Sequence, residues 1–472
     1  MRFTALIVVL TMICGIFGGN LSVSAIGANP LIGDVDEDGV LTVSDALRIL
    51  RVCVGFAEYD ENMLEVYDVW GDGDVDVKDA LGILRSSIGV IGSFGRTGVK
   101  FIFEPNTMAS EAGVTQEMLD RAIVHTEGTA RLAKVMDKAA RGEDISIVTI
   151  GGSVTQGYGI DVPEERYANI VSSWWEEAFP QANVNFTNAG IGGTGSIFGV
   201  HRLERDVFEY DPDLLIVEFA VNDKNDESVG TAESFEALIR RVLLERPNTA
   251  VIALFMVAKY CDSPYQKPIA EAYSIPIISF REAILPELDS GRFTWKGIMP
   301  DELHPNTQGH AITGGLITSY LDGVKSVYAD STRIEPLIPE TMLYGDRYMN
   351  AKMYWAGDEI EGLSLGSWKL DGYKYYDYTG SWYSSVSKRA FEFETEFKSI
   401  VIFYERTAIE SESGTVKISV TGERPVYVRS YFENGWEYLT AASVFSGEST
   451  EKRTVKITTT DGKFRIAAIF IA

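Results

Sequence analysis

The chain has 472 residues and a formal net charge of −26, and these two quantities limit what it can be. A chain of this length is expected to hold two to four domains. Its hydrophobic content of 45% indicates globular domains. The excess of acidic residues argues against binding to nucleic acid or to an anionic membrane surface. We therefore expect neither nucleic acid nor membrane among its partners.

The first segment, 1–25, has the pattern of a secretory signal peptide. Arg2 precedes an apolar stretch, and Val23-Ser24-Ala25 supplies the small residues of a cleavage site. A membrane anchor is the alternative, but the apolar stretch is interrupted by glycines and is short for a full span. We expect cleavage after Ala25 and a secreted bacterial protein without membrane attachment, associated with a cellulosome or the cell surface.

An internal repeat follows, in which 33–51 is echoed by 67–85. Each copy is a loop of twelve residues with alternating acidic positions and a glycine at position six, followed by an apolar helical stretch. This is the spacing of a calcium loop of the EF-hand type, where alternate oxygens converge on one cation. The predicted Ca²⁺ ligands are Asp34, Asp36, Asp38, Val40 and Asp45 in the first loop and Asp68, Asp72, Asp74 and Asp79 in the second.

The second loop is the weaker of the two. Trp70 stands at position three, and an indole cannot ligate calcium. Either a water or a neighbouring carboxylate takes that place, or the loop is only an acidic turn on a solvated surface. The two units, within 30–90, resemble the dockerin module of cellulosome enzymes. The resemblance implies calcium-dependent folding and docking to a cohesin domain of a scaffold protein. Val43-Ser44 and Val77-Lys78 replace the usual partner-selecting residues, so the usual cohesin specificity is not implied.

A linker and lead-in, 91–117, precedes a region of alternating strands and helices, 118–328. A helical pattern begins near 118, and a last helix is expected from Asn306 to about Leu321. The near-continuous apolar strands favour a parallel sheet covered by helices on both faces, an α/β fold of three layers. The predicted strands are 145–150, 183–190, 213–219, 249–258 and 275–280.

The stretch GGSVTQGYG, 151–159, directly follows the first of these strands and places Ser153 on a strand-to-helix turn. A serine acts as a nucleophile only when a base takes its proton and donors stabilise the oxyanion. His304 is the candidate base, because Asp301, three residues earlier, can orient its imidazole. Gly193 follows the second strand and Asn222 the third, and both are candidate oxyanion donors. A plain βα turn and a helix cap are the alternatives for these two stretches.

Ser153 in GGSVTQG, Gly193 in NAGIGGTGS, Asn222 in AVND, and His304 with Asp301 in DELHPN together resemble the SGNH (GDSL-type) hydrolase family over about 120–327. The resemblance implies a flavodoxin-like sheet and an acyl-enzyme mechanism without a metal in the chemistry. Ser153 would be the nucleophile, His304 the general base and acid, and Asp301 its orienting group. The N–H groups of Ser153 and Gly193 and the Asn222 side chain would hold the oxyanion. Calcium would then serve only the dockerin-like module.

Two departures from the family pattern concern the loops near the oxyanion. The first block reads GGSV instead of GDSL, and Ala220 stands where the third block usually has glycine. Neither departure removes a reactive atom, but both leave the acyl specificity open. Among the other histidines, His310 is expected to pack or cap within the last helix. His201 is expected to begin a helix whose remaining residues are solvated.

The last region, 335–472, has alternating, aromatic and β-branched runs that predict an all-β sandwich. Its opening stretch, 344–383, is dense in Tyr and Trp. Exposed aromatic rings would suit carbohydrate binding, but core and interface positions are at least as common for such residues. We expect one or two of these rings to be exposed.

The combination of a dockerin-like module with an SGNH hydrolase favours a secreted esterase similar to an acetylxylan esterase. Such an enzyme would remove O-acetyl groups from a plant cell-wall polysaccharide, xylan or mannan. This expectation rests on domain association. One alternative is a secreted esterase or lipase acting on lipids or feruloyl esters. Another is a non-catalytic carbohydrate-binding component of a cellulosome, which the intact Ser153, Asp301 and His304 argue against.

Overall fold

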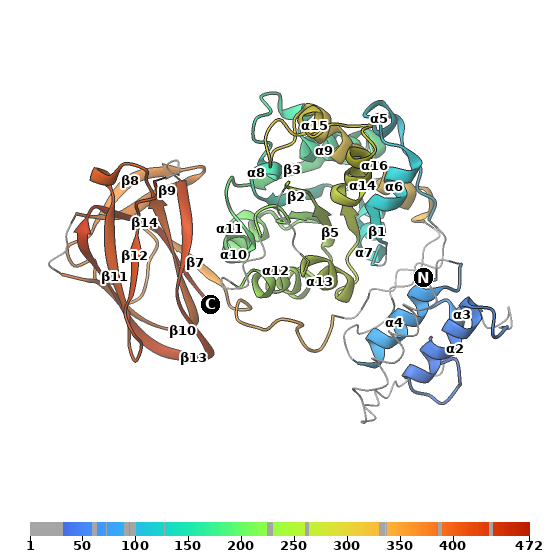
Figure 1. Ribbon diagram of the computed structural model, residues 1–472, viewed down its shortest axis with the longest axis horizontal. Coiled ribbons are helices and arrows are strands. Elements are labelled where there is room, and N and C mark those ends of the chain that lie inside the picture. Colours follow the sequence, from blue (N-terminus) through green and yellow to red (C-terminus); the bar gives the residue numbers. More distant parts are fainter. Residues whose placement is uncertain are drawn as a thin grey trace.

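A computed structural model describes the chain over the following residues: 32–58, 64–71, 73–88, 94, 101–126, 128–223, 230–259, 264–329, 336, 338–385, 389–433 and 438–472. A helical N-terminal module, an α/β domain and a C-terminal β domain follow one another along the chain (Figure 1). The expected signal peptide and Asp72 lie outside the described residues. Within the described part, the structure contains no helix with both the length and the apolar character that a membrane span requires.

The N-terminal module shows the internal repeat as two similar loop-and-helix units. Its helices are α2 (Val43–Cys53), α3 (Leu64–Tyr67) and α4 (Val77–Ser87). Both α2 and α4 begin with a capping box, in which the cap side chain and an aspartate three residues later satisfy each other's backbone N–H groups. Apolar residues of the two helices share one small core. The repeat in the sequence therefore corresponds to a repeat in structure.

The α/β domain is built on five parallel strands, and all five predicted strands are present. Their order in the sheet is β6-β5-β4-β2-β3, which is the flavodoxin-like order when the strands are counted along the chain. A short strand, β1 (Ile123–His125), adds to the β6 edge in antiparallel orientation. The parallel strands are β2 (Ile145–Gly151), β3 (Val184–Gly190), β4 (Leu214–Glu218), β5 (Ala250–Phe255) and β6 (Ile277–Ser279).

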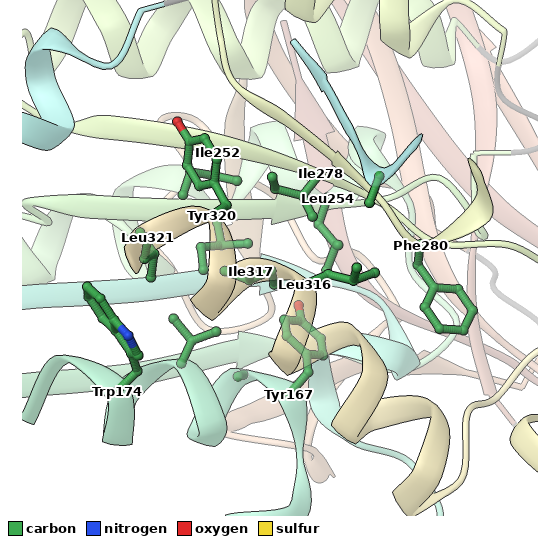
Figure 2. Packing of buried hydrophobic residues seen from close by; sticks show 14 of the residues in the cluster. Tyr167, Trp174, Ile252, Leu254, Ile278, Phe280, Leu316, Ile317, Tyr320 and Leu321 are labelled. Atoms are coloured by element: carbon green, nitrogen blue, oxygen red, sulfur yellow. The ribbon is translucent and has the colours of Figure 1, made fainter. Parts of the chain in front are cut away.

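Helices cover both faces of this sheet because successive strand residues point to opposite sides. In β4, Leu214 and Ile216 belong to one core and Leu215 and Val217 to the other. Figure 2 shows the first core, where Leu316 and other residues of the last helix pack against the sheet. The helices are α5 (Thr107–Glu111), α6 (Gln116–Ala122), α7 (Ala130–Ala140), α8 (Ser153–Gln156), α9 (Tyr167–Ala178), α10 (Ser196–His201), α11 (Leu203–Asp206), α12 (Thr231–Glu245), α13 (Gln266–Ala272), α14 (Phe280–Asp289), α15 (Trp295–Ile298) and α16 (Thr307–Val327).

The N-terminal part of this domain differs from the sequence expectation. The helical pattern that begins near 118 is interrupted, because β1 separates α6 from α7. Gly128, with φ of +82°, lies so close to the carbonyl of Ser274 that a Cβ would come within 1.8 Å of it, so the chain turns there. The packed structure also begins earlier, since α5 lies in the segment assigned to the lead-in and its Ala109 is fully buried.

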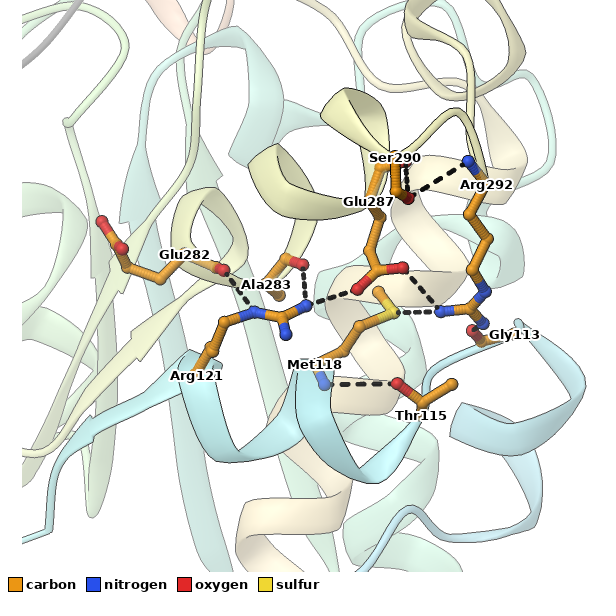
Figure 3. Close-up of polar contacts among 9 residues, drawn as sticks. All are labelled: Gly113, Thr115, Met118, Arg121, Glu282, Ala283, Glu287, Ser290 and Arg292. Carbon is orange, nitrogen blue, oxygen red and sulfur yellow. Dashed lines mark hydrogen bonds and ion pairs between the residues drawn. The ribbon is translucent and has the colours of Figure 1, made fainter.

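A polar network joins α6 to α14 (Figure 3). The Arg121 guanidinium donates to the carbonyls of Glu282 and Ala283 and pairs with Glu287. Arg292 also pairs with Glu287 and donates to the carbonyl of Gly113. Because the Glu287 side chain is only 13% exposed and receives two guanidinium groups, this network holds the α5–α6 segment against the rest of the domain.

The C-terminal domain is all-β, as predicted, but hydrogen bonds join its described strands into one antiparallel sheet and not into two separate sheets. The long strands β10 and β13 are neighbours in the interior of this sheet and pair from Phe391 to Arg406 of β10, with irregular pairing near Phe397 and Ile400. Such bulges let long strands bend at a corner, and β11 contacts β14 without being its hydrogen-bonded neighbour. The strands are β7 (Lys352–Trp355), β8 (Lys369–Tyr375), β9 (Tyr378–Ser384), β10 (Phe391–Arg406), β11 (Gly414–Val420), β12 (Val426–Arg429), β13 (Tyr438–Gly462) and β14 (Phe464–Ile471).

The β domain packs against α10 of the α/β domain. The Phe198 ring stacks on Phe403 and Phe470, with centroid distances of 4.7 and 5.4 Å. His201 is buried at the end of the same helix and stacks on Phe470 at 4.9 Å. The expectation that His201 begins a solvated helix is therefore wrong, because α10 is covered by a domain distant in sequence.

Tight packing of α16 leads to a first testable prediction. A Cβ at Gly315 would come within 2.7 Å of the backbone Cα of Ala109, so Gly315→Val should destabilise the domain by roughly 1–3 kcal/mol through overpacking. Chemical denaturation measures the change. Gly372→Val in β8 is the control, since a Cβ there meets no atom within 4 Å. Equal stability of the two variants would contradict the packing described for α16.

Candidate active site

The candidate site lies where three neighbouring strands of the parallel sheet end. β2 and β3 end side by side at Gly151 and Gly190, and β4 ends opposite Gly151 at Glu218. The segments that follow these strands carry Ser153, Gly193 and Asn222. In open α/β sheets, ligands bind at this edge where the strand order reverses, and here the reversal lies between β2 and β4.

Ser153 is the first residue of α8 and is 7% exposed. The helix has only four residues and ends at Gly157, whose φ of +82° terminates it. Gly152 lets the Asn222 side chain approach, because a Cβ there would lie 2.0 Å from the Asn222 Oδ1. The sequence therefore holds the nucleophile candidate on a tight turn and places an amide side chain directly beside it.

His304 joins Ser153 to Asp301, as the sequence predicts. The His304 Nε2 lies 2.9 Å from the Ser153 Oγ, and its Nδ1 lies 2.8 Å from the Asp301 Oδ2. The other Asp301 oxygen accepts the N–H groups of His304 and Leu303, each at 2.7 Å. Partial burial raises the pKa of the Asp301 carboxyl, but the hydrogen bonds from His304 and Leu303 outweigh it and lower that pKa below its ordinary value. The carboxylate therefore stays ionised and orients the ring.

Two residues near His304 were not identified from the sequence. The Trp295 indole donates to the Asp301 carbonyl at 2.7 Å and so supports the loop that carries the acid and the base. The Tyr158 ring lies over the His304 ring at a centroid distance of 4.5 Å and is 58% exposed. The only signal for Tyr158 was its place in GGSVTQGYG, and Trp295 had none.

The glycine turn after β3 lies next to the serine. A Cβ at Gly192 would be 3.8 Å from the Ser153 Cβ. Gly193 has φ of +74° and is exposed, and the Thr194 hydroxyl closes the turn by donating to the Ile191 carbonyl at 2.7 Å. A bare backbone at this place lets a developing oxyanion approach closely.

The β domain also reaches this turn. The Gly192 N–H donates to the Tyr376 hydroxyl at 3.3 Å, and that hydroxyl donates to the Gln156 side chain at 3.2 Å. The Tyr375 hydroxyl donates to the Gly192 carbonyl at 3.2 Å. Within the aromatic stretch of 344–383, Tyr344 and Tyr376 are the exposed Tyr and Trp rings, which confirms the expectation of one or two. The density of Tyr and Trp in the sequence identified this stretch, but it did not predict the contact with the Gly192 turn.

Buried polar groups support the turns from behind. Asp223, beside Asn222, accepts the N–H of Ser196 at 2.8 Å and the Gln266 amide at 3.0 Å. Burial raises the pKa of Asp223 to about 7 despite these hydrogen bonds. His310 accepts the backbone N–H of Tyr167 at 3.2 Å, and burial lowers its pKa to about 4, so it is a packed, neutral histidine as expected.

The first loop of the N-terminal module brings its acidic side chains together. Asp34, Asp36 and Asp38 each place a carboxylate oxygen within 4.8 Å of the others. Asp45 is buried at the start of α2, where its oxygens accept backbone N–H groups of Val35, Asp36 and Thr42. Converging carboxylates are the donor set that a hard cation such as Ca²⁺ prefers, so this loop fits the ion. Val40 follows Gly39 in this loop, at the position whose backbone carbonyl the sequence assigns to the ion.

The second loop is arranged differently. Trp70 is 7% exposed, donates to the Lys78 carbonyl at 3.1 Å, and meets the His125 ring of the α/β domain at 6.2 Å. The carboxylate of Asp68 accepts the N–H groups of Gly71 and Gly73, while Asp79 accepts those of Val69 and Asp76. Asp74 is exposed. Among the described residues of this loop, no three acids converge, and its third position does not fit a cation.

Comparisons with known proteins relate the chain to esterases. A family model described as the GDSL-like Lipase/Acylhydrolase family matches 149–312. A solved two-domain esterase active on acetylated mannans is 29% identical and covers 75% of this chain and 97% of its own, with a TM-score of 0.68. Such an esterase co-crystallised with mannopentaose is 30% identical, with the same coverage and TM-score. A comparison with curated proteins found no match.

The close approach of Asn222 to Gly152 gives the second prediction. Gly152→Ala should displace the amide and lower kcat for an aryl acetate by about 100-fold or more, the usual effect of losing one oxyanion donor, without unfolding the domain. Steady-state kinetics and circular dichroism measure both properties. Gly372→Ala, where a Cβ meets no atom within 4 Å, should behave like the parent. Unchanged kcat in Gly152→Ala would show that Asn222 is not part of the site.

Proposed function

The chain belongs to the GDSL-like lipase/acylhydrolase family and is a carboxylic-ester hydrolase, and from this premise we propose that it is a secreted esterase that removes O-acetyl groups from a plant cell-wall polysaccharide. The observation that carries the proposal is the hydrogen-bonded series Ser153–His304–Asp301. This series lies beside a glycine turn and an amide side chain, which can donate hydrogen bonds to an oxyanion. Acyl transfer requires such donors together with a nucleophile and its base.

The reaction follows from this geometry. The His304 Nε2 takes the Ser153 Oγ proton while Oγ bonds to the acetyl carbonyl carbon. The N–H groups of Ser153 and Gly193 and the Asn222 amide stabilise the resulting oxyanion. As the ester C–O bond breaks, His304 returns the proton to the sugar oxygen and leaves an acetyl-enzyme. A water, deprotonated by His304, then releases acetate and restores the serine.

For the polysaccharide, we favour acetylated mannan over acetylated xylan. The support is the similarity to esterases active on acetylated mannans, which extends over both the α/β and the β domain. Tyr376 brings the β domain to the edge of the site, so a polymer bound at Ser153 can contact both domains. An exposed Tyr158 beside His304 offers a ring face for a sugar, since aromatic side chains present large apolar surfaces.

The third prediction tests the reaction and the substrate together. Acetate release from acetylated mannan should exceed release from acetylated xylan and from feruloylated substrates. Ser153→Ala should lower it by at least about 1,000-fold, because the serine and histidine act as a unit. Ser110→Ala, an exposed serine on α5, is the control. Activity retained in Ser153→Ala would contradict the esterase assignment, and faster release of long-chain or feruloyl groups would favour the alternative substrates.

For the N-terminal module, we propose that it is a dockerin-like unit that binds one calcium ion in its first loop and docks to a cohesin domain outside the cell. The convergence of Asp34, Asp36 and Asp38 supports the ion site. The repeated loop-and-helix units and the signal-peptide pattern support docking and export. Bound Ca²⁺ would neutralise the carboxylates and stabilise the folded loop. Trp70 and Arg85 contact the α/β domain, and Arg85 pairs with Glu271 at 2.7 Å. Cohesin would bind the part of the module's surface that does not take part in this contact.

Calcium titration of the full chain gives the fourth prediction. Isothermal calorimetry should find one ion per chain, and Asp36→Ala should abolish binding because it removes one of the converging carboxylates. Asp74→Ala, which removes a carboxylate from the second loop, should bind normally. Two ions per chain would contradict the conclusion that the second loop, with Trp70 at its third position, does not fit a cation. An absence of binding would contradict the calcium proposal itself.

A further inference from the structure

A buried carboxyl group lies at the start of the turn that carries Asn222. Glu218 is the last residue of β4, four residues before Asn222, and its side chain is fully buried. The Thr155 hydroxyl and the backbone N–H groups of Val221 and Ala220 face its carboxyl group, but none reaches normal hydrogen-bond geometry. Among the described ion pairs none involves Glu218. An ionised carboxylate at such a place would be costly, because no cation compensates its loss of water.

Thr155 connects this carboxyl group to α8, the short helix that begins with Ser153. It is a fully buried residue of α8, two positions after Ser153. Its Oγ1 lies 2.8 Å from the Tyr167 hydroxyl of α9. A Cβ at Gly151 would come within 2.2 Å of the same Oγ1, so the hydroxyl rests against the end of β2. Glu218, Thr155 and Tyr167 thus form a buried polar series that runs behind Ser153.

The other groups near Glu218 define its charge. Asp223 is also fully buried, but it receives hydrogen bonds from Ser196 and Gln266. Two buried like charges that interact favour ionisation of only one, and Asp223, which receives the hydrogen bonds, is that one. Burial, with a smaller contribution from Asp223, raises the pKa of Glu218 to about 8. Burial likewise raises the pKa of Tyr167 well above its ordinary range, so the phenol stays neutral.

We propose that Glu218 is a positioning residue that works as a neutral carboxylic acid, joining the turn that presents Asn222 to the turn that presents Ser153. Its O–H group is directed toward the Thr155 Oγ1 in a contact weaker than a normal hydrogen bond, and the Thr155 hydroxyl donates to the Tyr167 oxygen. Loss of the Glu218 proton puts a negative charge beside Asp223 and removes the donor between the turns. Asn222 and Ser153 then lose their relative position, and kcat falls. This inference rests on the proposed esterase activity.

The pH profile of kcat for an aryl acetate, measured between pH 6 and 10, tests the proposal. We expect kcat to fall about ten-fold or more with a midpoint near pH 8, while KM is unchanged, since substrate contacts remain. Glu218→Gln should keep kcat at pH 7 within about three-fold and abolish the fall, because a neutral amide has the same shape and does not ionise. Glu176→Gln on the exposed face of α9 should retain the parental profile.

Thermal stability supplies a readout independent of turnover. In an unfolded chain Glu218 ionises near pH 4.5, against about 8 in the folded protein. Between these values the folded state holds the extra proton, so stability falls as pH rises and levels off above the folded pKa. Glu218→Gln removes this loss. Its Tm relative to the parent should therefore be higher at pH 8.5 than at pH 5.

Three outcomes would overturn the proposal. The first is a flat kcat up to pH 9.5 in the parent protein while near-UV circular dichroism shows it folded, and this result needs no variant. The second is an alkaline fall that persists in Glu218→Gln. The third is an inactive Glu218→Gln with a native Tm. None of them bears on which polysaccharide is deacetylated, because the ester used is a small one, and Ser153→Ala reports separately on the proposed function.

Discussion

The close approach of three backbone segments at the carboxyl edge of the sheet is the constraint on which the site depends. A Cβ at Gly151 would lie 2.2 Å from the Thr155 Oγ1, one at Gly152 would lie 2.0 Å from the Asn222 Oδ1, and one at Gly190 would lie 2.2 Å from the Gln156 N. Glycine alone fits at such distances. The turn that carries Ser153 can therefore pack directly on the ends of β2 and β3. It also lies beside Asn222, in the segment after β4.

The turn that carries Gly193 is held from two domains. On one side, Asp223 accepts the N–H of Ser196 at the start of α10, and Phe198 of that helix lies in the core of the β domain. On the other side, the hydroxyls of Tyr375 and Tyr376 contact Gly192. Preorganised donors cost no rearrangement when the oxyanion forms, so the β domain contributes to the geometry of the site as well as to its surface.

The two repeats of the N-terminal module have diverged in what their third positions contact. Asp36 faces Asp34 and Asp38 within the first loop, whereas Trp70 is buried against Phe94 and against His125 of the α/β domain. Gly82 makes room for the indole, since a Cβ there would lie 2.9 Å from the ring. An aromatic side chain offers buried apolar area that a carboxylate cannot. Thus the same loop pattern gathers carboxylates in one copy and forms a contact between domains in the other.

The sequence by itself determined which segments form the parallel strands, which residues follow them, and the series Ser153, His304 and Asp301, while the resemblance to the SGNH family implied the order of the strands. This was possible because apolar runs mark parallel strands, and the residues after such strands meet at one edge. Only the tertiary structure decided that Tyr376 reaches Gln156 across 220 positions of sequence, that Trp70 faces His125, that the described strands of the β domain form one continuous sheet, and that Glu218 is buried without an ion pair to any described residue. Each of these features depends on how segments that are distant in sequence pack against one another. Such contacts produce no periodic pattern of residues along the chain, so the sequence does not predict them.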